Sequence, residues 1–168
     1  MPQRSSTVRA ALNRLIVVCR DEVMALEAAA LTVGGERKRR LEQQASRRVI
    51  FQRDLARAVA TLGGVPAKGG SPRHRLARAL AIARSFFVRS RRVEIYDACA
   101  RATDKSARVY AAVLKSDGLP GDVLFGLEGQ YREIESDRNE LCWLRFGSSL
   151  TQSSSVPSAP VPAAVATT

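Results

Sequence analysis

Apolar residues recur every three or four positions along four long stretches of the chain, which is the spacing of one face of an α-helix. The stretches cover residues 8–33, 36–62, 93–115 and 119–146. A glycine pair separates the first two, and a Ser-Asp-Gly break followed by Leu-Pro separates the last two. Because such short breaks turn the chain back on itself, the pattern predicts two antiparallel helix pairs.

A longer segment joins the two pairs. Glycines and a proline at 63–66 end the second helix, and Ser71 followed by Pro72 is typical of a new helix start. The shorter helix predicted there lies on a basic stretch with His74, the single histidine. A long crossover of this kind is the connectivity of ferritin-like bundles and not of simple up-down bundles. We therefore expect an all-α, ferritin-like four-helix bundle, with the crossover carrying a short helix.

The chain has 168 residues, which is enough for one domain with a substantial core. We expect a flexible N-terminus at residues 1–6, the helical bundle at 7–146 and a disordered tail at 147–168. The tail is rich in Ser, Thr, Pro and Ala and has no charged residue. Such a segment cannot bury enough surface to offset the entropy of ordering it.

Composition narrows the class of protein further. Three cysteines without CxxC or metal-ligand spacing indicate buried thiols in a reducing compartment. The N-terminus lacks the apolar region of a signal peptide. No stretch approaches the roughly 18 apolar residues that span a bilayer. We expect a cytoplasmic protein without a membrane span.

Charge is unevenly distributed along the chain. The net charge is +11, yet acidic side chains outnumber basic ones after residue 117. One interpretation is an acidic last helix that packs among basic ones. The other is a basic outer face that meets an anionic partner.

Several polar residues fall on or beside the inward faces of the expected helices. The predicted interior polar network consists of Glu27, Gln44, Arg48, Asp104 and Arg138. Three interpretations of its two arginines stay open. They either lie at the bundle edge with their heads in water, or form a buried network that fixes helix register, or line a functional pocket.

A second group of residues is strongly basic and lies mostly off the apolar faces. This basic group consists of Arg37, Lys38, Arg39, Arg40, Arg47, Arg84, Arg89, Arg91 and Arg92. It is either a solvated helix surface or a surface for nonspecific binding of nucleic acid or another polyanion, which would be salt-dependent. No helix-turn-helix, zinc finger or set of stacking aromatics accompanies it, so sequence-specific recognition is not expected.

The chain resembles the bacterial ferritin-like four-helix-bundle family of unknown function, domain of unknown function 2383. The matching stretches are LNRLIVVCRD at 12–21, RRVIFQRDLARAVATLGGVP at 47–66 and LPGDVLFGLEGQYREI at 119–134, with a weaker match in YDACARATDKSARVYAAVL at 96–114. Together they cover about residues 10–146, in the family's order. The resemblance implies a fold and a superfamily but no reaction.

Di-iron members of that superfamily bind metal through Glu and Glu-x-x-His on helix pairs. This chain contains no Glu-x-x-His, and cations stand at two of its inward positions. A di-iron site is therefore disfavoured, and we expect no cofactor. The hypothesis for function is a non-catalytic bundle that acts by binding or self-assembly, as a homodimer, in a stress setting. A nonspecific polyanion-binding module is the first alternative, and a metal-binding protein is the second.

Overall fold

A computed structural model of the chain describes residues 2–68 and 92–150, and these are helical apart from short connections. The four helices are α1 (Pro2–Ala30), α2 (Gly35–Thr61), α4 (Arg92–Leu114) and α5 (Gly121–Leu150). The predicted all-α class and the four long helices are thus confirmed for the described residues. The short crossover helix predicted after Ser71 lies outside them.

Two of the predicted boundaries differ from the structure. Helix α1 begins at Pro2, so residues 2–6 are helical where a flexible N-terminus was expected. Proline fits the first turn of a helix, because its missing N–H has no partner there in any case. Helix α5 extends to Leu150, four residues past the expected end at 146. The glycine at 147 weakens a helix without ending it, and the remainder of the predicted tail lies outside the described residues.

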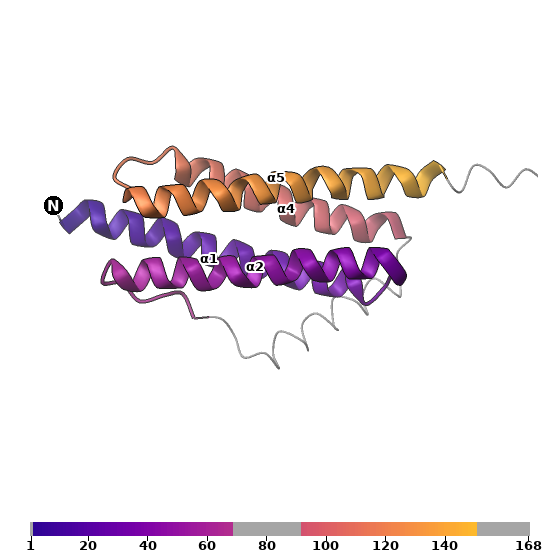
Figure 1. Ribbon diagram of the computed structural model, residues 1–168, viewed down its shortest axis with the longest axis horizontal. Helices are drawn as coiled ribbons and strands as arrows, with labels where there is room; N and C mark the ends of the chain where they lie inside the picture. The colour runs from indigo at the N-terminus through magenta and orange to yellow at the C-terminus, as the bar shows by residue number, and fades with distance from the viewer. Residues whose placement is uncertain (1, 69–91, 151–168) are drawn as a thin grey trace, which may run out of the picture.

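Tight connections make α1 and α2 antiparallel, and likewise α4 and α5. Gly35 has a φ of 59° and Gly118 a φ of 88°, a left-handed conformation that side chains other than glycine rarely adopt. Gly35 turns the chain between α1 and α2, and Gly118 turns it between α4 and α5. Figure 1 shows the result, in which α2 ends at one end of the bundle and α4 begins at the other. Helices α2 and α4 therefore run in the same direction.

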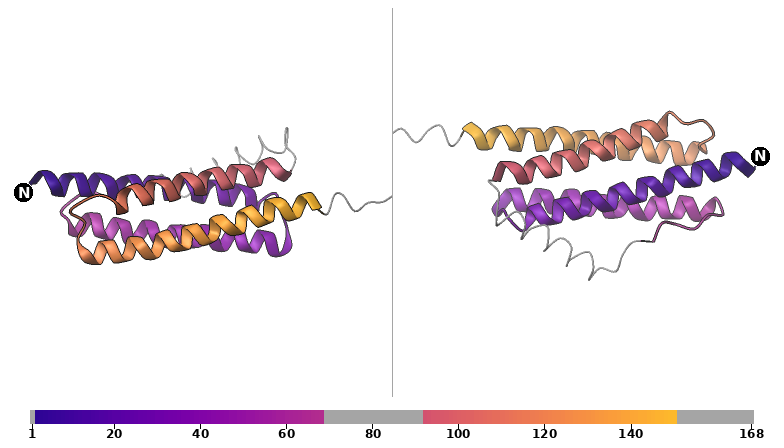
Figure 2. Two further views of the ribbon diagram at one scale, coloured as in Figure 1. Left: turned by 90° about the horizontal axis from the view of Figure 1, so that it is seen from above. Right: turned by 180° about the vertical axis from the view of Figure 1, so that it is seen from behind.

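The helices do not pack equally around the bundle. The close approaches between helices are concentrated in the α1–α2, α4–α5 and α1–α4 pairs, and α2–α5 is the loosest of the four neighbouring pairs. The two views in Figure 2 agree with this order, α1–α2–α5–α4, around the bundle. One long side of the bundle, between α2 and α5, is therefore the least closed by backbone packing.

After Leu62, residues 63–68 form a segment that turns away from that open side. Asn13 on α1 donates its side-chain amide to the Val65 carbonyl at 3.1 Å and accepts the Ala67 N–H at 2.6 Å. Farther along α1, Arg20 donates to the last carbonyl of the segment at 2.9 Å. These bonds hold the segment against α1, so these residues leave the α2–α5 side uncovered.

The core consists of two apolar clusters that follow one another along the bundle. The first contains Val8, Leu12, Leu15, Ile16, Val18, Cys19, Phe51, Leu55, Val59, Ala107, Val109, Tyr110, Val113, Leu127 and Ile134. The second contains Val23, Leu26, Ala29, Ala30, Leu41, Ala45, Tyr96, Cys99 and Leu141. On each helix the sequence passes from one cluster to the other across a short gap. Buried polar residues occupy that gap on all four helices.

Candidate functional site

The gap between the two apolar clusters holds a layer of buried charge. The guanidinium of Arg48 on α2 lies 2.9 Å from a carboxylate oxygen of Glu22 on α1 and 3.0 Å from one of Asp137 on α5. The three side chains are 0%, 1% and 6% exposed, respectively. Thr103 on α4 completes the layer by donating its hydroxyl to Glu22 at 3.0 Å. Each helix therefore contributes one side chain to this central layer.

The central layer is close to electrically neutral. Two carboxylates face Arg48, and a second cation, the half-exposed Arg47, also donates to Asp137. Arg48 itself lies over the ring of Phe51, with its guanidinium carbon 5.2 Å from the ring centroid. Its N–H groups are not aligned with the carboxylate oxygens as hydrogen bonds, although the distances are short. Charge attraction therefore holds Arg48 in place. These ion pairs only partly offset the free-energy cost of removing the guanidinium from water.

This arrangement leaves little scope for metal chemistry in the interior. A guanidinium, which stays protonated in proteins, stands between the two carboxylates that would otherwise attract a cation. Within residues 2–68 and 92–150, no three His, Cys, Asp or Glu side chains form a group able to hold a metal ion. The carboxylates of the central layer are instead paired with arginine side chains.

A short chain of polar contacts links α1, α4 and α5 next to the central layer. Gln130 on α5 accepts a hydrogen bond from the Tyr110 hydroxyl at 2.8 Å, and that hydroxyl lies 3.4 Å from the Cys19 sulfur. Because the hydroxyl has one proton, which goes to Gln130, the thiol is the donor in the second contact. Cys19 lies one helical turn before Glu22 on α1. All of these groups are buried.

Burial disfavours the thiolate form of two of the cysteines. Burial raises the pKa of Cys19 to about 12, and it raises the pKa of Cys99 to about 12 as well. Cys99 donates to the Ala25 carbonyl at 3.5 Å. Since the thiolate is the nucleophilic form, neither residue suits covalent catalysis near neutral pH. Cys142 on α5 is exposed, and all three cysteines are free.

The predicted polar network is divided between the interior and the surface. Gln44 and Arg48 are buried, with Gln44 donating to Glu140 at 3.0 Å. Asp104 and Arg138 do pair with one another, but they are 40% and 45% exposed on the α4–α5 side. Glu27 is half-buried, and it forms no ion pair with any side chain that the structure describes. The network expected from sequence therefore separates into an interior part and a surface pair.

Sequence reasoning missed the two acidic partners of Arg48. The spacing Ile134, Asp137, Leu141 places Asp137 on the inward face of α5, one position before Arg138 of the predicted network. Glu22 lies three positions after Cys19 and thus beside the inward face of α1. The helical spacing alone could have identified both residues. It could not have shown that they share one cation.

The basic group on α2 is largely matched by carboxylates. Lys38 pairs with Glu42, Arg39 and Arg40 pair with Glu36, Arg40 also pairs with Glu140, and Arg47 pairs with Glu133 and Asp137. Three of these contacts cross from α2 to the acidic helix α5, which accords with the interpretation of an acidic helix packed among basic ones. Arg37 is half-buried. Arg92 is the first residue of α4, whereas Arg84, Arg89 and Arg91 lie outside the described residues.

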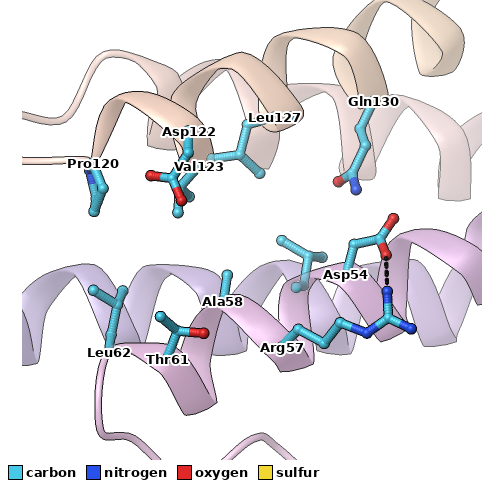
Figure 3. A pocket seen from close by; sticks show the side chains of 12 residues that line it. Asp54, Arg57, Ala58, Thr61, Leu62, Pro120, Asp122, Val123, Leu127 and Gln130 are labelled. Carbon is cyan, nitrogen blue, oxygen red and sulfur yellow. Dashed lines mark hydrogen bonds and ion pairs between the residues drawn. The ribbon is translucent and has the colours of Figure 1, made fainter.

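Where these cross-helix ion pairs end, α2 and α5 enclose an open groove of about 430 Å³. It is lined by Asp54, Leu55, Arg57, Ala58, Thr61, Leu62, Pro120, Asp122, Val123, Gly126, Leu127 and Gln130. Figure 3 shows these side chains facing one another across the space between the two helices, with Gln130 pointing from α5 toward α2. A smaller hollow, of about 220 Å³, lies beside Asp104 and Arg138.

None of the described helices combines the length and apolar character that crossing a bilayer requires. Comparison with known proteins found no matching family model, no matching curated protein and no matching solved structure. The geometry of the central layer and of the α2–α5 groove therefore carries the functional argument.

Proposed function

We propose that this protein is a non-catalytic, ferritin-like bundle that acts by binding, and that its partner docks in the α2–α5 groove. The observation that carries the proposal is the contrast between the interior and this side of the bundle. Inside, Arg48 and Arg47 already pair with the carboxylates of Glu22 and Asp137. Outside, the loosest helix pair leaves a largely apolar space that the residues after α2 do not cover.

The ferritin-like part of the proposal rests on chain direction. Helices α2 and α4 run in the same direction, and the end of α2 and the start of α4 lie at opposite ends of the bundle (Figure 1). Bundles with one long crossover have this connectivity, whereas an up-down bundle alternates throughout. A cation supplied by Arg48 at mid-bundle then takes the electrostatic role that a metal has in metal-binding relatives of this architecture.

Metal analysis tests the non-catalytic part directly. The protein is purified without chelators, incubated aerobically with ferrous iron, separated from free metal and assayed for bound iron. We expect substoichiometric iron and no accelerated iron oxidation, because Arg48 repels a second cation from its carboxylate partners. Stoichiometric iron that disappears in a Glu22→Gln variant would place a metal centre in the central layer and overturn the proposal.

The alternative function is polyanion binding by the basic group. A titration with duplex DNA distinguishes it from binding in the α2–α5 groove. Ion pairs with α5 and within α2 already occupy most of the described members of the basic group. We therefore expect a log–log salt slope shallower than about −4, equivalent to fewer than roughly four neutralised phosphates. A steeper slope would favour the basic module over a groove-binding protein.

A further inference from the structure

We propose that the α2–α5 groove binds a small, uncharged apolar molecule that carries a hydrogen-bond acceptor such as a carbonyl or hydroxyl oxygen. Gln130 is the residue that receives this acceptor. The inference rests on the proposed function, since it names the class of ligand for the same groove. Size, lining, charge and one buried donor each support it.

The size and lining of the groove suit a small molecule. A volume of about 430 Å³ lies within the range of roughly 300–1,000 Å³ that is typical of ligand sites. Its walls are mainly aliphatic, with Leu55 and Ala58 from α2, Leu62 just after it, and Val123 and Leu127 from α5. Figure 3 shows Ala58 and Leu62 across the space from Val123 and Leu127. Such walls attract the apolar part of a ligand by removing it from water.

One polar group at the groove is oriented and has a hydrogen-bond donor to spare. Gln130 is 9% exposed, and its Oε1 accepts the Tyr110 hydroxyl at 2.8 Å. The amide oxygen of Gln130 thus faces Tyr110, and its N–H₂ group is the other end of the amide. Its Nε2 makes no hydrogen bond to any residue that the structure describes and is not fully buried, and Figure 3 shows the amide pointing toward α2. A nearly buried amide with a free N–H₂ selects for an acceptor on the ligand, because leaving that donor unpaired is unfavourable.

Charge around the groove disfavours an ionised ligand. Arg57 lies 3.3 Å from Asp54 and is thus already paired, and Asp122 adds one further negative charge. An anionic head would meet this excess negative charge. A cationic head would pair with Asp122, but it offers Nε2 of Gln130 no acceptor. An uncharged acceptor satisfies both conditions.

The groove can be filled by a substitution that leaves the fold intact. A Cβ atom added at Gly126, which lines the groove, or at Gly129, which does not, would have no neighbouring atom within 4 Å. Replacing either glycine with leucine also removes the helix penalty of glycine, about 1 kcal/mol. Gly126→Leu therefore places a side chain in the groove, and Gly129→Leu is its matched control on the same helix.

The first experiment titrates the full chain with Nile red, an uncharged apolar dye with a carbonyl acceptor, and follows its fluorescence. We expect saturable binding to the unchanged protein and to Gly129→Leu. For Gly126→Leu we expect a loss of affinity of at least about tenfold, because the side chain occupies the space of the dye. Equal binding by the two leucine variants would overturn the proposal.

The second experiment tests the acceptor. Undecan-2-one and undecane, which differ by one carbonyl oxygen, compete for bound Nile red. We expect the ketone to compete at least about tenfold better, and the advantage to vanish in Gln130→Glu, which keeps an acceptor for Tyr110 but removes the donor. Decanoate and decyltrimethylammonium serve as charged competitors and should be weaker than the ketone. An alkane as strong as the ketone would contradict the role of Gln130.

Light scattering distinguishes failure of this inference from failure of the proposed function. If the protein is a dimer that Gly126→Leu dissociates and Gly129→Leu does not, a second copy of the chain occupies the groove. The small-molecule inference then fails while a binding function stands. Stoichiometric iron in the interior would instead remove the proposed function, whatever the groove binds.

Discussion

Removing Arg48 alone should destabilise the bundle more than any other single change in the central layer. The Arg48→Met variant keeps a long apolar stem but leaves Glu22 and Asp137 buried without the cation between them. Both carboxylates are almost fully buried, so water cannot replace the lost charge. Breaking a buried ion pair in this way costs about 3–5 kcal/mol. For a protein with a total stability of roughly 5–15 kcal/mol, that is a large fraction.

The matched control neutralises the whole layer. The variant Glu22→Gln/Arg48→Met/Asp137→Asn removes all three charges while Gln and Asn keep acceptors for Thr103 and Arg47. Because the N–H groups of Arg48 are poorly aligned with the carboxylates, the ion pairs of the native layer do not fully offset the cost of burying its charges. We therefore expect the triple variant to recover most of the stability that Arg48→Met loses. Replacing a buried ion pair with uncharged side chains can even raise the free energy of unfolding by about 1–4 kcal/mol.

Urea unfolding followed by circular dichroism at neutral pH measures both effects. If Arg48→Met unfolded at the same urea concentration as the unchanged protein, or if the triple variant were as unstable as the single one, the electrostatic account of the central layer would be wrong.

Two further outcomes follow from burial and packing. A thiol reagent at pH 8 should label Cys142 rapidly, and it should label Cys19 and Cys99 only when the protein unfolds. The free energy of unfolding should fall as pH rises from 9 toward 12, because the two thiols lose their protons in the unfolded protein but keep them in the folded one. Mass spectrometry of labelled peptides checks the first statement, and urea midpoints against pH check the second; early labelling of either buried thiol would contradict both. Gly64→Ala should destabilise the protein by about 1–3 kcal/mol, because its Cβ would lie 3.1 Å from a backbone carbonyl of α2, whereas Gly129→Ala should stabilise it by about 0.5–1 kcal/mol. Thermal unfolding of the two alanine variants tests this expectation, and equal unfolding midpoints would contradict it.

The local parts of the fold were predictable from sequence because they depend on near neighbours along the chain. The three- and four-residue spacing identified four helices, and the glycine-containing breaks placed their connections near Gly35 and Gly118. Helix ends were less predictable. Pro2 and Leu150 extend α1 and α5 beyond the expected limits, because nothing in their local sequence forbids another turn of helix.

The candidate sites were only partly predictable for a physical reason. Spacing marks a residue as inward, and it did so for Gln44 and Arg48, but it does not say which inward charges meet. The pairing of Arg48 with Glu22 and Asp137 depends on how three helices are placed along one another. The surface position of Arg138 depends on the rotation of α5, where a difference of one residue turns a side chain by about 100°.

The sequence by itself determined the helical class, the number of long helices, the buried character of most stripe residues and the opposition of basic and acidic segments. Only the tertiary structure decided that α2 and α5 are the loosest pair, that the residues after α2 follow α1, and that an open groove remains beside Gln130. Periodicity is a property of one helix, whereas a groove is a property of the distance between two. That distance results from packing around the whole bundle, which no local pattern encodes.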